Sequence, residues 1–201
     1  SMEEKGKIRL VFATGNRHKI QEIQHVIGSQ IHLEGLAELG FRGDIPEEQE
    51  TLEGNAIQKA MFIYDRFGTD CFADDTGLEI DALGGAPGVY SARYAGAHCS
   101  FEDNMNKVLA ALRGKDQRQA RFRTVIALVE KGTVTTFEGE IRGTITREKR
   151  GSGGFGYDPV FLPDGYERTF AEMNLTEKNR ISHRALAVQK LADYLRIRYI
   201  R

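Results

Sequence analysis

A short segment near the start of the chain combines residues that are suited to binding phosphate. It follows an apolar run, precedes a helical pattern, and consists of Thr14, Gly15, Asn16, Arg17, His18 and Lys19. The first amides of a helix are free to donate hydrogen bonds, and the helix dipole favours an anion at that end. Gly15 allows close backbone approach, and Lys19 adds a positive charge. The segment predicts a phosphate site, although an ordinary strand-to-helix turn capped by Asn16 explains the same residues.

A pair of adjacent acids, Asp74 and Asp75, predicts a metal site. The pair directly follows residues 70–73, which are expected to form a strand. Buried carboxylates are costly unless a cation or hydrogen bonds hold them, and carboxylates commonly bind Mg²⁺ that accompanies a phosphate substrate. Because side chains alternate along an extended backbone, we expect only one of the two acids to reach the metal. An Asx turn at the strand end is the alternative explanation.

A glycine-rich loop runs from residue 151 to residue 159. Its four glycines permit close approach and positive φ angles, while Phe155 and Tyr157 offer flat faces on which a nucleobase could stack. Asp158 stands at the exit of the loop. This combination is typical of a nucleotide pocket, but glycine-rich turns with an aromatic residue also join ordinary strands.

Cationic side chains near the end of the chain stand where a helix normally disfavours them. Ser182 stands where a helix cap belongs, so His183 and Arg184 fall in the first helical turn, where cations are disfavoured. Residues that break such rules are candidates for function, and donors fixed here could read acceptor atoms on a base. A surface cation is the other explanation of Arg184. Arg93 could clamp a phosphate or pair with an acid, and the sequence leaves both open.

The apolar pattern alternates between strands and helices, which is typical of an α/β fold. A hairpin turn at residues 130–132 makes the predicted sheet mixed. Phe67 and Leu186 are among the helix residues expected to face inward. The predicted elements are a strand at 8–13, a helix ending at Gly28, a helix at 52–67, a strand at 70–73, a helix at 101–112, strands at 120–129 and 134–145, and a helix at 182–198.

Composition narrows the class of protein. With 201 residues and 40% hydrophobic residues, the chain can bury a core, and we expect one domain over residues 1–201. A net charge of -1 gives no bulk attraction to nucleic acid or to a membrane. Cys71 and Cys99 lack metal-ligand spacing, and no long apolar run or signal peptide is visible, so a reduced cytoplasmic protein is expected. Ser1 ahead of Met2 looks like the remnant of an expression tag.

Six motifs, in order and spacing, resemble the Ham1/RdgB-type inosine triphosphate pyrophosphatases over essentially the whole chain. They are Thr14–Asn16 with Lys19, Ala73–Gly77, Gly84–Gly88, Ser91–Tyr94, Gly153–Pro159 and Ile181–Arg184. The resemblance implies hydrolysis of noncanonical purine nucleoside triphosphates, namely dITP, ITP and XTP, to the monophosphate and pyrophosphate, which cleanses the nucleotide pool. It also implies Mg²⁺ and a homodimer. The implied fold is an elongated mixed β-sheet flanked by helices, with two lobes around a central nucleotide cleft, as in ITPase and Maf proteins.

The same resemblance implies roles for individual residues. It places the general base and metal ligand on Asp75, with Thr76 next to it where relatives more often have serine. The implied substrate contacts are Thr14, Gly15, Asn16, Arg17, His18, Lys19, Thr76, Phe155, Gly156, Tyr157, Asp158, Lys178, His183 and Arg184. For a second metal carboxylate, the spacing to Asn55 favours Glu47, with Glu48 and Glu50 as alternatives. Taken alone, these three acids read as a solvated charge run.

Two other functions compete with this interpretation. A related Maf-type pyrophosphatase acting on pyrimidine nucleotides would share the architecture, but it should lack the elements at 155–158 and 182–184. A nucleotide-binding sensor without catalysis would have no need of the acid pair Asp74 and Asp75. The predicted enzyme should distinguish hypoxanthine and xanthine, which carry an oxygen at purine position 6, from adenine, which carries an amine there. Hydrogen-bond donors of the protein that pair with the oxygen would stay buried and unpaired when they meet the amine.

Overall fold

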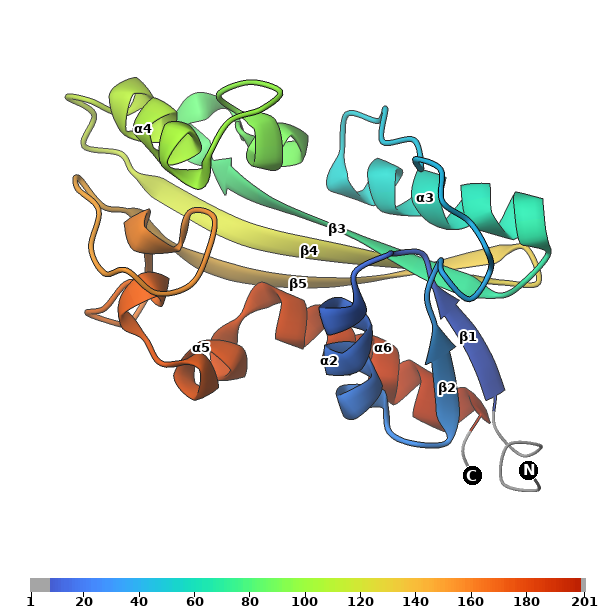
Figure 1. Ribbon diagram of the computed structural model, residues 1–201. Coiled ribbons are helices and arrows are strands. Elements are labelled where there is room, and N and C mark those ends of the chain that lie inside the picture. Colours follow the sequence, from blue (N-terminus) through green and yellow to red (C-terminus); the bar gives the residue numbers. More distant parts are fainter. Residues whose placement is uncertain (1–7, 200–201) are drawn as a thin grey trace. The chain divides into compact units, whose positions relative to one another are not determined.

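The computed structural model of the protein describes residues 8–199. Ser1, the expected tag remnant, lies outside the described residues. Short 3-10 helices lie at Asp81–Leu83, Gly88–Arg93, Asp158–Val160 and Phe170–Glu172. The strands and longer helices are β1 Ile8–Phe12, α2 Arg17–Ile27, β2 Ile31–Glu34, α3 Leu52–Phe67, β3 Cys71–Ile80, α4 Phe101–Ala111, β4 Gln119–Glu130, β5 Thr133–Ile145, β6 Phe161–Pro163, α5 Leu175–Ile181 and α6 His183–Tyr199 (Figure 1).

The strands of residues 8–199 form a mixed sheet in the order β2-β1-β3-β4-β5-β6. β1 runs parallel to β2 and β3, whereas β5 and β6 are antiparallel. β4 and β5 are joined at Lys131 and Gly132, whose φ angles of 49° and 85° are those of a two-residue hairpin turn. The predicted α/β fold, a mixed sheet flanked by helices, is therefore confirmed.

The described residues divide into two compact units, which correspond to the two predicted lobes. Unit 1 contains residues 8–75, 125–138 and 187–199, and unit 2 contains residues 76–124 and 139–186. β3, β4, β5 and α6 each contribute residues to both units.

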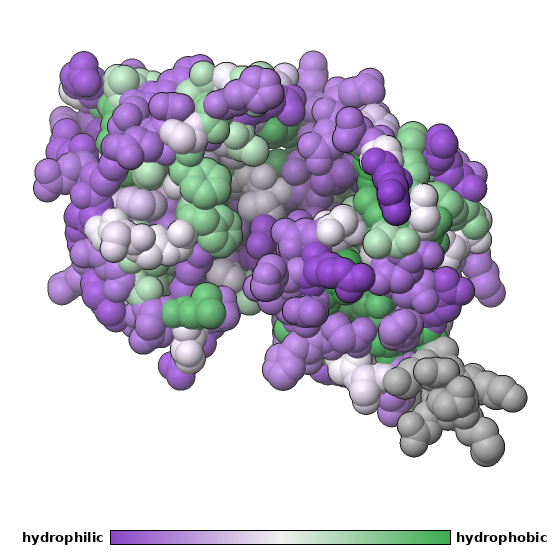
Figure 2. All heavy atoms as spheres, in the orientation of Figure 1, coloured by the Kyte–Doolittle hydropathy of each residue, from purple (hydrophilic) through white to green (hydrophobic). Residues whose placement is uncertain are grey.

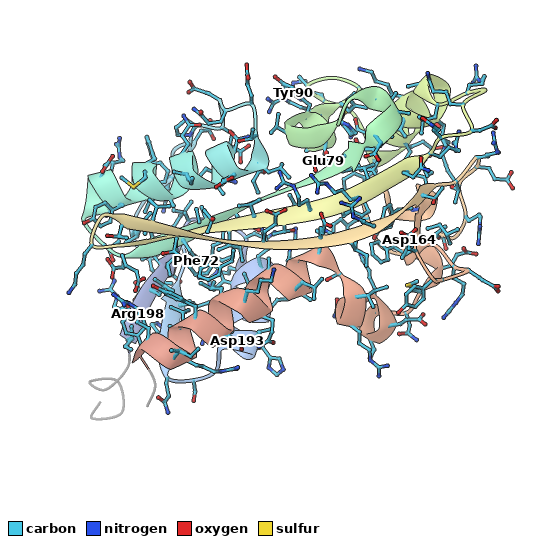
Figure 3. All side chains as sticks on the ribbon, turned by 180° about the vertical axis from the view of Figure 1, so that it is seen from behind. Phe72, Glu79, Tyr90, Asp164, Asp193 and Arg198 are labelled. Carbon is cyan, nitrogen blue, oxygen red and sulfur yellow. The ribbon has the colours of Figure 1, made fainter. Side chains whose placement is uncertain are left out.

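Helices cover both faces of the sheet in unit 1. The stacked rings of Phe12 and Phe72, with centroids 4.5 Å apart, lie at the centre of its core. Ile23 of α2 and Leu191 of α6 pack against this core, and both helices lie on the same face of the sheet (Figure 1). Phe72 of this core is labelled in Figure 3. α3 lies on the other face (Figure 1), where the Cys71 thiol donates to the carbonyl of Ala60 at 3.1 Å. Burial of apolar surface on both faces makes this part of the sheet rigid enough to hold polar side chains in place.

Unit 2 is built around a cluster of aromatic side chains. The ring centroid of Phe122 on β4 lies 4.6 Å from that of Phe161 and 5.9 Å from that of Phe170. Leu78 of β3 and Val108 of α4 belong to the same buried cluster. This core underlies the glycine-rich loop at 151–159.

Local signals explain where the helices begin and end. The Asn16 and Thr51 side chains cap α2 and α3, and Ser100 forms a capping box with Asp103 at the start of α4. α3 ends at Gly68, whose φ of 63° is left-handed. The predicted helices therefore agree with the observed ones to within one residue.

Three short elements escaped prediction from the sequence. β2, β6 and α5 have four, three and seven residues, which is too short for a periodic pattern to emerge. The predicted strand at 70–73 is also too short, because β3 continues to Ile80. The acid pair therefore lies within β3, which runs between β1 and β4 in the sheet.

Two residues predicted to face inward are exposed instead. Phe67 is 38% exposed and packs edge to face on Phe41 at 6.2 Å, on the outer side of α3. Leu186 is 41% exposed, because the buried stripe of α6 runs through Ala187, Val188 and Leu191 and leaves Leu186 on the opposite side. Both predictions were wrong for the same reason, which is that an apolar side chain near a helix end need not lie on the core stripe.

No helix among residues 8–199 is long and apolar enough to cross a membrane. Figure 2 shows hydrophilic side chains over most of the face in view, with hydrophobic residues in small groups between them. Small apolar groups of this kind are ordinary on protein surfaces.

The buried side chain of Arg118 links the ends of two elements of unit 2. Arg118 is 6% exposed, and its guanidinium donates to the carbonyls of Leu112, Lys115, Ile145 and Thr146 at distances of 2.7–3.3 Å. The first two carbonyls end the α4 segment and the other two end β5. One side chain therefore joins α4 to β5.

Replacement of Arg118 by Met should lower the free energy of unfolding by about 2–4 kcal/mol, because four carbonyls lose their donor in a buried place. Arg113→Met is the matched control. Arg113 lies at the same helix end, and no side-chain hydrogen bond of Arg113 is found among residues 8–199, so this variant should change stability by less than about 0.5 kcal/mol. Urea denaturation of both variants measures the difference. Equal stabilities would contradict the joining role of Arg118.

Candidate active site

The loop from Thr14 to Lys19 connects β1 to α2, as predicted. The Thr14 hydroxyl accepts from the amide of Asn16 at 3.1 Å, and the Asn16 side chain accepts from the amide of Lys19 at 3.2 Å. A Cβ built on Gly15 would meet no atom within 4 Å, so the space beside this residue is open. Arg17 and His18 are exposed in the first turn of α2. The loop thus presents a helix N-terminus with open space in front of it.

The acid pair sits within β3, and the two side chains meet different partners. Asp74 accepts from the ammonium of Lys19 at 3.0 Å, with only 7% of its side chain exposed. Asp75 accepts from the side-chain amide of Asn55 on α3 at 3.2 Å. Since α2 and α3 cover opposite faces of the sheet in unit 1, the two carboxylates point to opposite faces, as the alternation of an extended backbone predicts.

Burial makes Asp75 a weaker acid than an ordinary aspartate. The pKa of Asp75 is raised to about 6, chiefly because burial disfavours the charged carboxylate. The positive charge of Lys59 and the hydrogen bond from Asn55 lower the pKa, while the negative charges of Glu47 and Asp74 raise it. A carboxylate with a pKa near neutrality is a stronger base than an ordinary aspartate and is still largely ionised at neutral pH.

Glu47 belongs to the same surroundings. Its carboxylate pairs with the ammonium of Lys59 at 2.7 Å, and the Lys59 side chain is only 13% exposed. Asn55 and Lys59 were not singled out from the sequence. Their spacing of four residues places them on one face of α3, which is a signal that gains meaning only once Asp75 is known to lie beside that helix. We call residues 14–19 with Glu47, Asp74 and Asp75 the unit 1 site.

The unit 1 site fits a divalent ion that arrives with phosphate. Residues 8–199 contain no group of three or more His, Cys, Asp or Glu side chains that could hold a metal ion. Mg²⁺, however, is usually held by one or two carboxylates together with substrate phosphates and water. Asp75 and Glu47, which interact electrostatically, provide such a donor set.

The glycine-rich loop of unit 2 is shaped by Asp158. Its carboxylate accepts from the amide of Phe155 at 3.1 Å and from the ammonium of Lys178 at 2.6 Å. Gly154 has a φ of 72°, and a Cβ there would lie 2.2 Å from the Asp158 carboxylate. Glycine is therefore required at position 154 for two reasons: the φ angle is positive, and a Cβ would collide with the Asp158 carboxylate. Gly156 also has a positive φ, of 60°.

The two aromatic residues of the loop have different environments. Phe155 is 56% exposed, and the ammonium of Lys178 lies 4.4 Å from its ring centroid. Tyr157 is buried in the core of unit 2, and its hydroxyl donates to the carbonyl of Ser91 at 2.6 Å. Burial raises the pKa of the Tyr157 hydroxyl. The sequence offered both rings for stacking, but only the Phe155 ring has an exposed face, because the Tyr157 ring fills the core.

The start of α6 holds polar atoms without partners. The Ser182 side chain accepts from the amide of Ala185 at 3.1 Å, so Ser182 caps the helix as predicted. His183 Nδ1 and Arg184 Nε are buried and have no hydrogen-bond partner among residues 8–199. Such orphaned atoms are rare in folded proteins and require an explanation. We call residues 153–158 with Lys178, His183 and Arg184 the unit 2 site.

His183 is held neutral by its surroundings. Its pKa is lowered to about 3, first by burial and then by the positive charges of Arg184 and Lys178. The imidazole stacks on Phe122, with centroids 5.0 Å apart and planes inclined by 16°. A neutral imidazole has one donor and one acceptor nitrogen. Phe122 was not identified from the sequence, which offers no signal for this contact.

Two further residues have partners that the sequence did not predict. The Thr76 hydroxyl lies 2.8 Å from that of Thr124 on β4. The guanidinium of Arg93 lies 5.1 Å from the ring centroid of Tyr90. Of the two alternatives for Arg93, a phosphate clamp and an acidic partner, neither describes this contact with an aromatic ring.

The chain matches known proteins over most of its length. The model of the Ham1 family matches residues 10–194. The chain belongs to the Ham1 family. It is 55% identical to a protein of Porphyromonas gingivalis named dITP/XTP pyrophosphatase, over 93% of this chain and 97% of that one. It is 50% identical to a protein of the same name from Flavobacterium johnsoniae, over 94% and 98% of the two chains.

Solved structures of Ham1 proteins share the fold. The Ham1 protein of Staphylococcus aureus has a TM-score of 0.91 at 37% identity and covers 94% of this chain and 99% of its own. The HAM1 protein of Coxiella burnetii has a TM-score of 0.90 at 39% identity, with 94% and 98% covered. The family resemblance seen in the motifs is thus confirmed.

The lowered pKa of His183 predicts how stability depends on pH. The unfolded chain binds a proton at His183 near the ordinary histidine pKa, whereas the folded chain resists it until about pH 3. Stability should therefore fall as the pH drops below the ordinary value. His183→Asn removes this contribution, so its free energy of unfolding should fall less steeply, by up to roughly 1.4 kcal/mol per pH unit between about pH 6 and pH 4.

Urea denaturation across this pH range measures the two slopes. His32→Asn is the control, because the His32 side chain is 56% exposed. A slope for His183→Asn equal to that of the wild type would show that His183 is not held neutral by the fold.

Proposed function

We propose the following roles for the two sites of this protein, which hydrolyses noncanonical purine nucleoside triphosphates to the monophosphate and pyrophosphate. The activity rests on identities of up to 55% over almost the full length to proteins named dITP/XTP pyrophosphatase. The unit 1 site handles the triphosphate and the hydrolysis, and the unit 2 site selects the base. Residues 1–201 act together as one functional domain.

In the unit 1 site, the loop amides and Lys19 bind the phosphates. Gly15 leaves the open space that a phosphate oxygen needs to approach the backbone. Lys19 already faces a carboxylate, Asp74, so its ammonium is held in place before the substrate arrives. Asp75 and Glu47 would hold Mg²⁺, which supplies a positive charge against the charge that develops on the phosphate oxygens.

Asp75 acts as the general base. A water molecule attacks the α-phosphorus, the bond from phosphorus to the bridging oxygen breaks, and pyrophosphate leaves. The proton of the attacking water passes to the Asp75 carboxylate. Without a bound ion, the pKa of Asp75 is raised to about 6, so the carboxylate is mostly ionised at neutral pH and can accept a proton or ligate a cation. Asn55 keeps the carboxylate in place through its hydrogen bond.

The unit 2 site recognises the purine. One structural observation carries this assignment: His183 Nδ1 and Arg184 Nε are buried and have no hydrogen-bond partner within residues 8–199. Nitrogen donors at these positions would pair with the oxygen at purine position 6, and an adenine amine would leave them unpaired at a cost of about 1–3 kcal/mol for each group. The exposed ring of Phe155 provides a face on which the base stacks.

The remaining roles follow from the family resemblance. We assign substrate contacts to Thr14, Asn16, Arg17, His18, Thr76, Gly156, Asp158 and Lys178, whereas Tyr157 supports the loop from the core. The ion is Mg²⁺, the assembly is a homodimer, and the location is the cytoplasm. The two cysteines of the described residues, Cys71 and Cys99, are free thiols, which accords with a reducing compartment.

Replacement of Asp75 by Asn should lower kcat for ITP by roughly 100-fold or more, because the water loses its proton acceptor. Asp65→Asn is the matched control, since Asp65 is an exposed acid on α3 of the same unit. Release of pyrophosphate in the presence of Mg²⁺ measures both rates, and circular dichroism confirms folding. Near-normal turnover by Asp75→Asn would remove Asp75 from the role of base.

Replacement of Phe155 by Leu should raise KM for ITP roughly tenfold through the loss of stacking. Phe101→Leu is a control of equal chemistry, because Phe101 of the same unit is 57% exposed, against 56% for Phe155. Its KM should stay close to that of the wild type. A panel of ITP, XTP, GTP, ATP and dTTP completes the test. Equal activity on all five nucleotides, or preference for dTTP, would contradict purine selection.

A further inference from the structure

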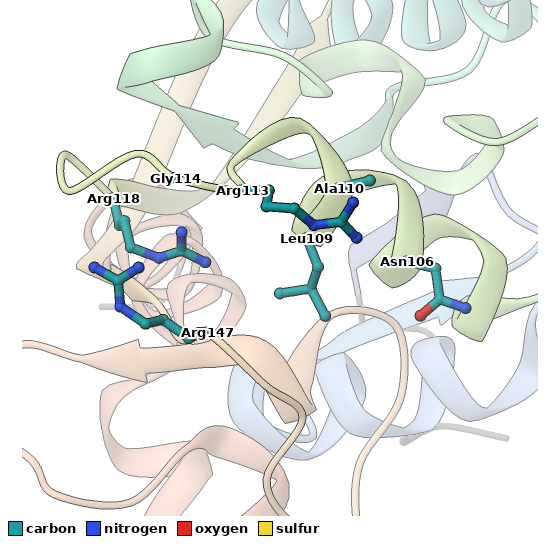
Figure 4. A pocket seen from close by; sticks show the side chains of 7 residues that line it. All are labelled: Asn106, Leu109, Ala110, Arg113, Gly114, Arg118 and Arg147. Carbon is teal, nitrogen blue, oxygen red and sulfur yellow. The ribbon is translucent and has the colours of Figure 1, made fainter.

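A cavity of about 530 Å³ lies in unit 2, outside both sites described above. It lies beside the end of α4 and the segment that follows β5 (Figure 4). The lining residues are Asn106, Leu109, Ala110, Arg113, Gly114, Arg118 and Arg147. None of them belongs to the unit 1 site or the unit 2 site. Its volume falls in the range of small-molecule sites.

Three of the seven lining residues are arginines, and none is an acid. Figure 4 shows the side chains of Arg118 and Arg147 close together, although they come from the two ends of the chain segment 118–147. The charge of Arg147 adds to burial in lowering the pKa of Arg118. Two guanidinium groups of like charge thus interact, and an anion bound near both of them would offset their repulsion.

The carboxylates of the described residues compensate this charge only weakly. Arg147 pairs with Asp116 at 3.1 Å, but the Arg147 side chain is 64% exposed and that of Asp116 is 97% exposed. Such exposed pairs contribute little and are screened by salt. For Arg113, residues 8–199 offer no carboxylate within ion-pair distance. The cavity therefore keeps a net positive charge.

A structural role explains only one of the three arginines. Arg118 donates to the carbonyls of Leu112 and Lys115 and thereby stabilises the end of α4. Arg147 lies two residues beyond β5, and its hydrogen bond among the described residues goes to Asp116 rather than to that helix end. The rigid Arg118 instead forms a fixed wall, toward which the exposed Arg147 brings a second guanidinium.

We propose that this cavity binds a phosphate-anhydride anion, either free pyrophosphate or the diphosphate of a nucleotide. Guanidinium groups donate paired N–H bonds that match the oxygens of phosphate, and several of them together favour a multivalent anion over a monovalent one. Asn106 adds a neutral side-chain amide to the lining. The protein itself releases pyrophosphate, so this anion is produced wherever the enzyme works.

Titration of the full chain with inorganic pyrophosphate tests the proposal. The Nε–Hε resonances of the arginines are followed by ¹H–¹⁵N NMR in a buffer that contains EDTA, so that no Mg²⁺ takes part. The resonances of Arg113 and Arg147 should shift and saturate. Arg147→Ala should raise the Kd read at Arg113 roughly tenfold, through the loss of one bidentate contact.

Arg142→Ala is the matched control. Arg142 is an exposed arginine of β5 whose side chain is 62% exposed, against 64% for Arg147, and it does not line the cavity. It should change the Kd by less than about twofold, since a charge outside the cavity acts only through the screened field. Equal effects of the two variants, no saturation in the wild type, or equal affinity for sulfate would each overturn the proposal.

A parallel titration with ADP distinguishes the two sources of the anion. Tighter binding of ADP than of pyrophosphate assigns the cavity to a nucleotide, and the reverse order assigns it to free pyrophosphate. Hydrolysis of ITP by Arg147→Ala in the presence of Mg²⁺ should match that of the wild type. Because the binding experiment contains no Mg²⁺ and no turnover, failure of the proposed catalytic roles would leave its outcome unchanged.

Discussion

Two adjacent carboxylates in the middle of a buried strand impose the main constraint on this fold. Asp74 and Asp75 need partners on opposite faces of β3, and these partners come from different helices. Lys19 reaches one carboxylate from α2, and Asn55 reaches the other from α3. The packing of helices on both faces of the sheet is therefore also the means by which the acids are held. The pKa of Asp75 rises to about 6 because this compensation is incomplete and burial outweighs the partners.

The unit 2 site differs from the unit 1 site in how its buried polar groups are paired. Asp158 and Lys178 pair almost completely out of water, which fixes the glycine-rich loop. Close to Lys178 in the chain, His183 Nδ1 and Arg184 Nε have no hydrogen-bond partner in the part of the chain that the structure describes. Packing on Phe122 provides the rigidity that hydrogen bonds do not. In the role proposed for this site, the satisfied contacts fix its shape and the unpaired nitrogens select the ligand by hydrogen bonding.

Sequence patterns predicted most of this fold and part of its geometry. The long helices were predictable because caps such as Asn16, Ser100 and Ser182 act locally, within three residues of the amides they bind. The length of β3 was not predictable, because it depends on pairing with neighbouring strands such as β4, which are distant in the chain. The stacking of His183 on Phe122 joins residues 61 positions apart, and no periodic pattern records such a contact. Motif spacing identified the residue types of both sites, whereas the difference between the exposed Phe155 and the buried Tyr157 emerged only from packing.

Ser91 connects parts of unit 2 that would otherwise open separately. Its carbonyl accepts from the hydroxyl of Tyr157 at 2.6 Å, and its own hydroxyl accepts from the amide of Leu78 on β3 at 2.9 Å. The glycine-rich loop and the strand beyond Asp75 therefore share one serine. Local opening of the loop should loosen the hydrogen bond that protects the Leu78 amide, so we expect that amide to exchange with solvent in the same cooperative unit as the loop. The rate of hydrogen exchange at a single strand position should then report how often the glycine-rich loop opens.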